Sequence, residues 1–187
     1  MGSFKIEGGN KLSGSIVPQG AKNEALQVLC ALLLTKEKVV ISNLPDIIDV
    51  NKLISLLKNL GVSIIKLDEG KYEFQASNID ISYLESDQFK IDGKGLRGSI
   101  MLVGPLLGRF GVGSIPLPGG DKIGRRRLDT HFEGFIKLGA KFNYNKENYF
   151  YTVKSKRLKG VEMLLDEPSV TGTANILMAS VLAKGRS

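Results

Sequence analysis

The segment 118–127 gathers the side chains with the clearest chemical potential in this sequence. Beside three glycines and one acid, Asp121, it carries the cations Lys122, Arg125, Arg126 and Arg127. Glycines let a backbone approach a ligand closely, and lysine and arginine suit a phosphate or carboxylate group. Asp121 then acts either as a counter-charge or as a proton donor. The pattern predicts a loop that covers an anion, or else an ordinary exposed basic loop.

Two further cations, Lys22 and Arg97, stand beside the expected starts of apolar helices. A repeat in the sequence places Asn23, Leu96 and Thr171 at equivalent positions near three such starts. Helix N-termini offer free backbone N–H groups and the positive end of the helix dipole, so cations placed there oppose the dipole unless they serve an anion. We expect the three helix starts to converge on an anion site.

The elements that must position these residues recur along the chain. An apolar helical stretch and a strand over 25–45 return over 98–118, and the two Leu-Pro pairs that end them are 73 positions apart. Amphipathic helices follow and end at Gly61 and Gly139, where glycine suits the left-handed C-cap. These ends are 78 positions apart. The second copy therefore has five extra residues, and they fall in the basic segment.

The repeat predicts an α/β (α+β) fold of helix-strand-helix-strand-strand units. We expect the first unit over about 22–90, the second over about 91–165, and the start of a third over 166–187. The first helix of each unit is apolar on nearly every face, which is typical of a helix surrounded by protein. Paired strands are expected at 62–66 with 71–75 and at 141–145 with 149–154. Because the third unit stops after its first helix, the sequence predicts a piece of a longer protein.

Composition indicates the chemical class of the binding partner but does not identify a single partner. A formal charge of +7 favours anionic partners such as nucleotides, phosphates or nucleic acid. No run approaches the roughly 20 apolar residues that span a bilayer and no secretory signal follows Met1, so we expect no membrane partner and a soluble, cytoplasmic protein. No metal-ligand cluster or cofactor motif is visible. Cys30 is predicted to pack in the core, and His131 to cap or pack.

Four motifs, in order, resemble those of the UDP-N-acetylglucosamine 1-carboxyvinyltransferase family of enolpyruvyl transferases. They are Gly20-Ala21-Lys22-Asn23-Glu24-Ala25-Leu26, Leu96-Arg97-Gly98-Ser99, Leu117-Pro118-Gly119-Gly120-Asp121-Lys122-Ile123-Gly124 and Pro168-Ser169-Val170-Thr171-Gly172-Thr173. The resemblance implies two inside-out α/β barrel domains of three units each, with substrates in the cleft between them. It assigns residues 1–21 to the second domain and 22–187 to the first, incomplete, domain.

The resemblance also implies an activity. Members of this family transfer the enolpyruvyl group of phosphoenolpyruvate to the 3-hydroxyl of UDP-N-acetylglucosamine and release phosphate, the first committed step of peptidoglycan synthesis. They use no metal or organic cofactor. The catalytic base comes from the C-terminal half, so this chain alone is expected to be inactive.

Two other functions are weaker alternatives. The sister enzyme that acts on shikimate 3-phosphate has Asp-Lys-Ser where this chain has Ala21-Lys22-Asn23. A nucleic-acid-binding module would carry aromatic stacking residues beside its cations, and segment 119–130 contains no aromatic residue. We therefore expect no nucleic-acid partner.

The resemblance assigns roles by motif position. It makes Asp121 the proton donor, where many relatives carry cysteine, and it places Lys22 and Arg126 on phosphoenolpyruvate. The expected contacts of the sugar nucleotide and its cleft are Asn23, Arg97, Arg127, Leu128, Asp129, Thr130, Glu167, Pro168, Ser169, Val170 and Thr171. Some relatives have proline where this chain has Arg127.

The aspartate has two expected consequences. Asp121 must be protonated to act as an acid, and because nearby arginines lower its pKa, burial has to raise it. We therefore expect Asp121 to be buried only in a closed, substrate-loaded state. Since the carboxylate replaces the thiol that fosfomycin alkylates in cysteine-bearing relatives, the resemblance also implies intrinsic resistance to that antibiotic.

Overall fold

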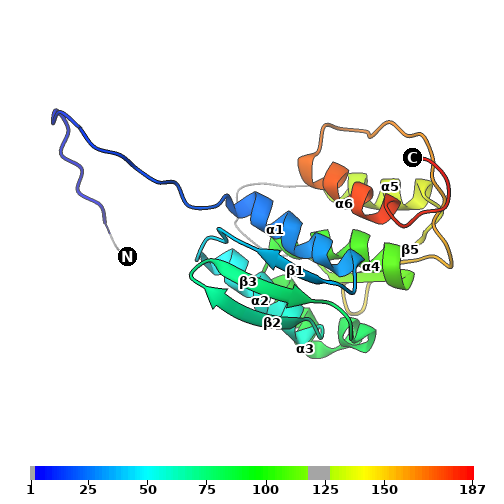
Figure 1. Cartoon of the computed structure of the whole chain (residues 1–187). Coiled ribbons are helices and arrows are strands. Elements are labelled where there is room, and N and C mark those ends of the chain that lie inside the picture. Colours follow the sequence, from blue (N-terminus) through cyan, green and yellow to red (C-terminus); the bar gives the residue numbers. More distant parts are fainter. Residues whose placement is uncertain (1–2, 118–126) are drawn as a thin grey trace.

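Two three-stranded antiparallel sheets share one strand order. A computed structural model describes residues 3–117 and 127–187 (Figure 1). In spatial order the strands are β1 (Lys38–Ile41), β3 (Lys71–Gln75) and β2 (Ser63–Asp68) in the first sheet, and β4 (Val112–Pro116), β6 (Phe150–Lys154) and β5 (Lys141–Asn145) in the second. In both sheets the third strand of the unit lies in the centre. The strand pairs predicted within each unit are therefore confirmed.

Six α-helices and three short 3-10 helices accompany these sheets in the described residues. The α-helices are α1 (Lys22–Ala31), α2 (Ile48–Asn59), α3 (Asp87–Lys94), α4 (Val103–Phe110), α5 (Asp129–Lys137) and α6 (Val170–Ser180). The 3-10 helices are η1 (Leu32–Leu34), η2 (Ile81–Glu85) and η3 (Arg97–Leu102). The element order repeats as helix-strand-helix-strand-strand, so the predicted fold class is confirmed. Within residues 3–117 and 127–187 the sheets stay separate and form no closed barrel.

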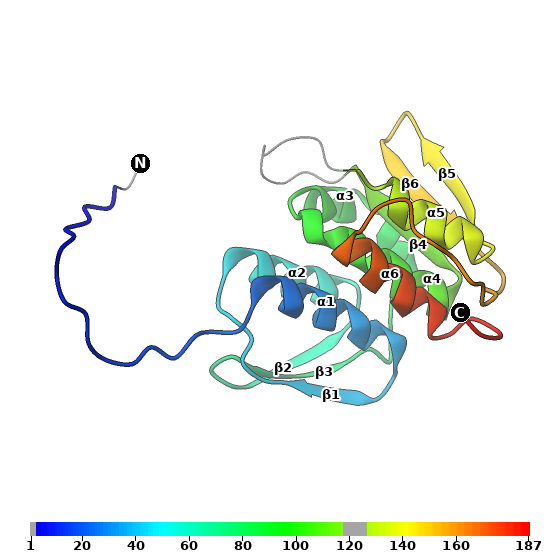
Figure 2. The ribbon, with the colours of Figure 1, turned by 90° about the horizontal axis from the view of Figure 1, so that it is seen from above.

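The apolar first helices of the units form the centre of the molecule. Figure 2 shows α1, α4 and α6 side by side, with the first sheet on one side and the second sheet on the other. Leu29, Leu106 and Ala179, one from each helix, are fully buried. They belong to a single hydrophobic core that also takes in Phe74 and Val153 from the two sheets. Burial on several faces explains why these helices carry so few polar residues.

The second helix of each unit is amphipathic and ends as the sequence predicts. In α2 the buried residues Val50, Leu53 and Leu57 follow the helical repeat. Gly61 and Gly139 adopt positive φ angles of 101° and 94° just beyond α2 and α5. Such angles are strained for other residues, which explains glycine at both helix ends.

The start of the second unit differs from the prediction. A continuous helix was expected from about residue 98, but residues Arg97–Leu102 form the 3-10 helix η3 and the α-helix begins at Val103. Pro105 accounts for this, because proline lacks an N–H donor and fits only the first turn of an α-helix. Starting α4 at Val103 places Pro105 in that turn.

The segment that links the first sheet to the second unit's apolar helix contains helices that the sequence analysis missed. Neither η2 nor α3 was predicted. Each begins with a capping side chain: Asp80 accepts a hydrogen bond from the N–H of Ser82 at 2.9 Å, and Ser86 accepts one from that of Phe89 at 3.0 Å. Such residues favour helix starts, but the short polar stretch behind them gives little apolar periodicity.

Residues 3–21 contain no helix or strand and extend away from the body of the molecule (Figure 1). Apart from Gly20 they are exposed, including Phe4 and Ile16. Cys30, by contrast, is fully buried in the core, as predicted. In the described part of the chain no helix is both long and apolar enough to cross a membrane.

The close contact of α4 with α6 gives a test of the packing. A methyl group added at Gly104 would overlap the carbonyl oxygen of Asn175 on α6. We expect Gly104→Ala to lower the free energy of unfolding by about 1–3 kcal/mol, the usual cost of overpacking, measured by urea denaturation. In Gly95→Ala the new methyl would lie 3.6 Å from its nearest neighbours, so this control should change stability by less than about 0.5 kcal/mol. Equal losses in the two variants would contradict the packing described.

Candidate active site

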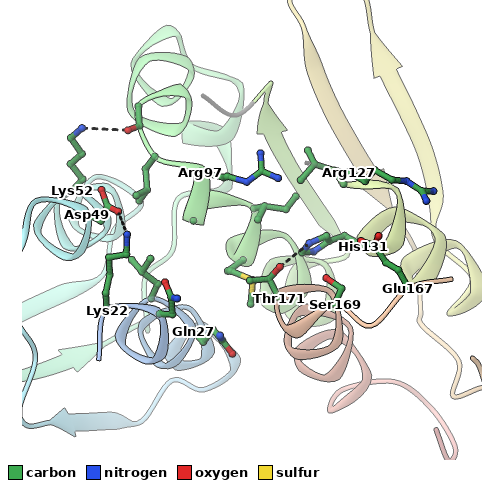
Figure 3. A pocket seen from close by; sticks show the side chains of 18 residues that line it. Lys22, Gln27, Asp49, Lys52, Arg97, Arg127, His131, Glu167, Ser169 and Thr171 are labelled. Carbon is green, nitrogen blue, oxygen red and sulfur yellow. Dashed lines mark hydrogen bonds and ion pairs between the residues drawn. The ribbon is translucent and has the colours of Figure 1, made fainter. Parts of the chain in front are cut away.

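A pocket of about 730 Å³ lies where the starts of α1, η3 and α6 meet (Figure 3). Asn23, Leu96 and Thr171, the equivalent residues of the three units, all line it. The predicted convergence of the three helix starts is therefore observed. The described lining comprises Lys22, Asn23, Leu26, Gln27, Asp49, Lys52, Gly95, Leu96, Arg97, Gly98, Ile100, Met101, Arg127, Leu128, His131, Glu167, Ser169 and Thr171.

One side of the pocket is formed by α1 and α2. Lys22, the first residue of α1, donates from Nζ to Oδ2 of Asp49 at 3.0 Å. Asp49 lies in the first turn of α2, where the helix dipole stabilises a carboxylate. Both side chains are partly exposed, at 47% and 38%, so this ion pair contributes little stability and Lys22 can exchange its partner for an anionic ligand. The sequence analysis missed Asp49.

The opposite side is formed by the start of α5 and the segment before α6. Arg127 donates from Nε to Oδ2 of Asp129 at 2.9 Å and from Nη2 to Oδ2 of Asp166 at 3.0 Å. Thr130 donates to Asp166 at 2.6 Å. The hydrogen bond from Thr130, together with the charge of Arg127, holds the pKa of Asp166 below its ordinary value. These contacts fix the Arg127 guanidinium at the pocket rim.

The start of α6 completes this side. Ser169 caps the helix, because its Oγ accepts a hydrogen bond from the N–H of Gly172 at 3.1 Å. Glu167, Ser169 and Thr171 line the pocket.

The predicted site residues do not all line the pocket. The structure brings together Lys22, Asn23, Arg97, Arg127, Leu128, Glu167, Ser169 and Thr171. Four others stand beside this lining and are not part of it: Asp129, Thr130, Pro168 and Val170. Thr130 is buried and Val170 is 77% exposed. The predicted acid Asp121 and the predicted phosphate ligand Arg126 lie outside the described residues.

His131 lines the pocket although its side chain is only 3% exposed. Its Nδ1 lies 3.0 Å from the amide nitrogen of Asn175. Burial, and secondarily the charge of Arg97, lowers the pKa of His131 to about 4. The imidazole is therefore neutral near pH 7. The sequence predicted a packed histidine, and the structure adds that it faces the predicted site.

The described lining has a positive balance. It contains four cations, Lys22, Lys52, Arg97 and Arg127, against two acids, Asp49 and Glu167. Backbone N–H groups at the starts of α1 and α6 reinforce this field. Such a pocket suits an anionic ligand with more than one polar group. Residues 3–117 and 127–187 contain no group of three or more His, Cys, Asp or Glu side chains placed to hold a metal ion.

Solved structures share this fold. The enolpyruvyl transferase NikO from Streptomyces tendae superposes with a TM-score of 0.68 at 18% identity, over 95% of this chain and 41% of that one. EPSP synthase from Acinetobacter baumannii gives a TM-score of 0.65 at 15% identity, over 92% and 39%. The fold is thus that of the enolpyruvyl transferases. The chain belongs to the EPSP synthase (3-phosphoshikimate 1-carboxyvinyltransferase) family, whose sequence model matches residues 6–187.

Curated relatives are more similar in sequence. The UDP-N-acetylglucosamine 1-carboxyvinyltransferase of Bacteroides fragilis is 59% identical over 187 residues, which is 100% of this chain. That of Porphyromonas gingivalis is 56% identical over 185 residues, or 99% of this chain. The chain spans 43% of the length of each.

The buried histidine predicts how stability depends on pH. An unfolded histidine binds a proton near pH 6.5, whereas folded His131 stays neutral down to about pH 4, so the free energy of unfolding should fall as the pH drops through this window. Between pH 7 and pH 4.5 the loss should be about 2 kcal/mol, measured by urea denaturation. Asp80 and Asp166 have lowered pKa values and contribute only at lower pH, where their carboxylates become protonated.

His131→Gln provides the control, because glutamine does not titrate. Its free energy of unfolding should change much less between pH 4.5 and 6.5, whatever its value at pH 7. Parallel pH profiles for the two proteins would contradict a buried, neutral His131.

Proposed function

We propose that this chain forms the first part of an enzyme that transfers the enolpyruvyl group of phosphoenolpyruvate to the 3-hydroxyl of UDP-N-acetylglucosamine and releases phosphate. The observation that carries the proposal is the positively charged pocket at the meeting point of three helix starts, lined by Lys22, Arg97 and Arg127. Both proposed substrates are anionic and offer several oxygen acceptors. The names of the relatives at 56–59% identity support this choice of substrates.

The two substrates are assigned to different sides of the pocket. Lys22, whose only described ion-pair partner is the partly exposed Asp49, is the proposed contact of phosphoenolpyruvate, with Arg126 as a second cation. The sugar nucleotide is assigned to Asn23, Arg97 and the side formed by Arg127, Leu128, Asp129, Thr130, Glu167, Pro168, Ser169, Val170 and Thr171. Asp129 and Thr130 contribute through backbone groups and by holding Arg127 and Asp166 in place.

The proposed transfer of the enolpyruvyl group requires an acid, and it requires cations that bind the phosphate group. Addition places a proton on the methylene carbon of phosphoenolpyruvate and joins its neighbouring carbon to the sugar 3-oxygen, whose own proton passes to a base. Elimination then breaks the bond to phosphate and removes a proton from the new methyl group, which restores the double bond. Asp121 is the proposed acid. The cations stabilise the charge on the departing phosphate, and the base is assigned to the remainder of the longer enzyme.

Other functions fit the site less well. The family model carries the name of the shikimate enzyme, but the EPSP synthase structure of the same fold is only 15% identical to this chain. A nucleic-acid-binding module would present aromatic rings for stacking. The described lining contains no phenylalanine, tyrosine or tryptophan. A role in peptidoglycan synthesis and a cytoplasmic location accompany the proposed activity. Fosfomycin resistance is proposed because Asp121 replaces the thiol that this antibiotic alkylates.

A direct test is phosphate release from phosphoenolpyruvate in the presence of UDP-N-acetylglucosamine. We expect the 187-residue chain to be inactive and a chain completed to the length of its relatives to be active. In the completed enzyme, Lys22→Ala should lower kcat/KM by about 10²–10³-fold, the usual effect of removing one charge-stabilising group. Lys146→Ala, in the exposed turn between β5 and β6, is the matched control. Turnover of shikimate 3-phosphate in place of the sugar nucleotide would refute the assignment.

The aspartate in the basic loop gives a second test in the completed enzyme. Asp121→Asn should abolish phosphate release, because an amide cannot donate the required proton, whereas Asp121→Cys should retain part of it. Fosfomycin should alkylate only the cysteine variant, as seen by the mass of the protein. Rapid labelling of the unsubstituted enzyme would show that Asp121 does not confer resistance.

A further inference from the structure

A buried hydrogen-bond network lies behind His131 of the pocket lining, and the proposed activity assigns no role to it. His131 of α5 and Asn175 of α6 are 3% and 0% exposed. The Asn175 side chain makes three contacts. Its oxygen accepts from the N–H of Gly104 at 2.8 Å, and its nitrogen donates to the carbonyl oxygen of Ile100 at 2.9 Å and lies 3.0 Å from Nδ1 of His131. The network therefore joins η3, α4, α5 and α6.

These contacts determine which imidazole nitrogen carries the proton. The orientation of the Asn175 amide is fixed by two backbone groups, because only its oxygen can accept from Gly104 and only its nitrogen can donate to Ile100. Its second N–H consequently points at Nδ1 of His131. An amide nitrogen donates and does not accept, so Nδ1 must be unprotonated. The neutral ring then carries its proton on Nε2.

The Nε2 proton is directed toward the pocket. Figure 3 shows His131 pointing toward Thr171, near Arg97. The contact of Nε2 with the Thr171 hydroxyl is 3.5 Å, longer than the 2.7–3.2 Å of an ordinary N–H···O hydrogen bond. Since Thr171 is an exposed residue in the first turn of α6, a ligand oxygen can approach both groups. The Nε2–H donor of His131 is thus held in place, while its contact with Thr171 is too long for a strong hydrogen bond.

We propose that His131 is a specificity-determining residue that donates a hydrogen bond from Nε2 to an uncharged carbonyl or hydroxyl oxygen of the sugar nucleotide, and that Asn175 is the positioning residue that sets its tautomer. The identity of the ligand rests on the proposed function. A neutral donor complements the neighbouring cations, which favour phosphate and carboxylate oxygens. It allows the pocket to select a ligand that carries both charged and uncharged acceptors.

The tautomer can be tested without any ligand, because His131 is the only histidine in the sequence. In the 187-residue chain labelled with ¹⁵N-histidine, long-range ¹H–¹⁵N correlation spectra should show one ring, protonated on Nε2 and neutral down to about pH 5. Asn175→Asp replaces the donor by an acceptor of the same shape. It should move the proton to Nδ1 or protonate the ring. A proton on Nδ1 in the unsubstituted chain would overturn the inference.

The ligand contact is tested by titrating UDP-N-acetylglucosamine into the same labelled chain. Binding should shift the Nε2 and Hε2 resonances. His131→Leu should weaken the affinity by about tenfold, the usual effect of losing one hydrogen bond with a buried donor. His131→Gln, which keeps an N–H donor, should recover part of that loss, and Lys146→Ala should bind like the unsubstituted chain. Circular dichroism of each variant establishes that it is folded.

The outcomes separate this inference from the proposed function. If the sugar nucleotide binds but the His131 resonances do not move, or His131→Leu binds as well as the unsubstituted chain, the histidine does not contact the ligand. If the sugar nucleotide binds neither this chain nor the enzyme completed to the length of its relatives, the substrate assignment and the contact to it are both wrong, while the spectrum of the free chain still decides the tautomer.

Discussion

The contact between α4 and α6 is the constraint on which the pocket depends. Gly104 lets the two helices approach until the Asn175 amide reaches the backbone of α4 and η3. This amide pairs with the N–H of Gly104, one of the first N–H groups of α4, which have no partner within the helix, and with the carbonyl oxygen of Ile100 in η3. Thr171, in the first turn of α6, lies 3.5 Å from Nε2 of His131 on α5. The geometry of the anion site is therefore a consequence of helix packing in the core and not of surface loops alone.

Charge in the site is arranged at two levels. Lys22 and Arg127, two of the cations that line the pocket, form ion pairs: Lys22 contacts Asp49, and Arg127 contacts Asp129 and Asp166. His131, which lines the pocket but is almost fully buried, is kept neutral by burial and by the charge of Arg97. Lys22 can thus exchange its partner at small cost, whereas Arg127 is held by two carboxylates and His131 presents a fixed uncharged donor. Such a division suits a ligand that has a charged end and an uncharged end.

Sequence alone predicted the parts of this structure that local chemistry determines. The helix ends at Gly61 and Gly139 could be predicted because left-handed backbone favours glycine. The equivalent positions Asn23, Leu96 and Thr171 in the repeat, with Lys22 and Arg97 beside two of them, predicted where the three helix starts meet. The hydrogen-bond and ion-pair partners of the site residues could not be predicted from the sequence. Asp49 lies 27 residues from Lys22 and Asn175 lies 44 from His131, and such pairings arise only from tertiary packing. Helix α3 was missed because its polar sequence leaves the capping serine as the main signal.

The shared strand order of the two sheets allows one unit to diverge while the other stays unchanged. Each sheet is complete within its own unit, so neither needs the connection between its first strand and the following helix to have a given length. That connection spans residues 42–47 in the first unit and 117–128 in the second. A duplicated scaffold of this kind can acquire new chemistry when one connection is lengthened. Selection for folding then acts on the helices and sheets, and selection for reactivity acts on the inserted residues.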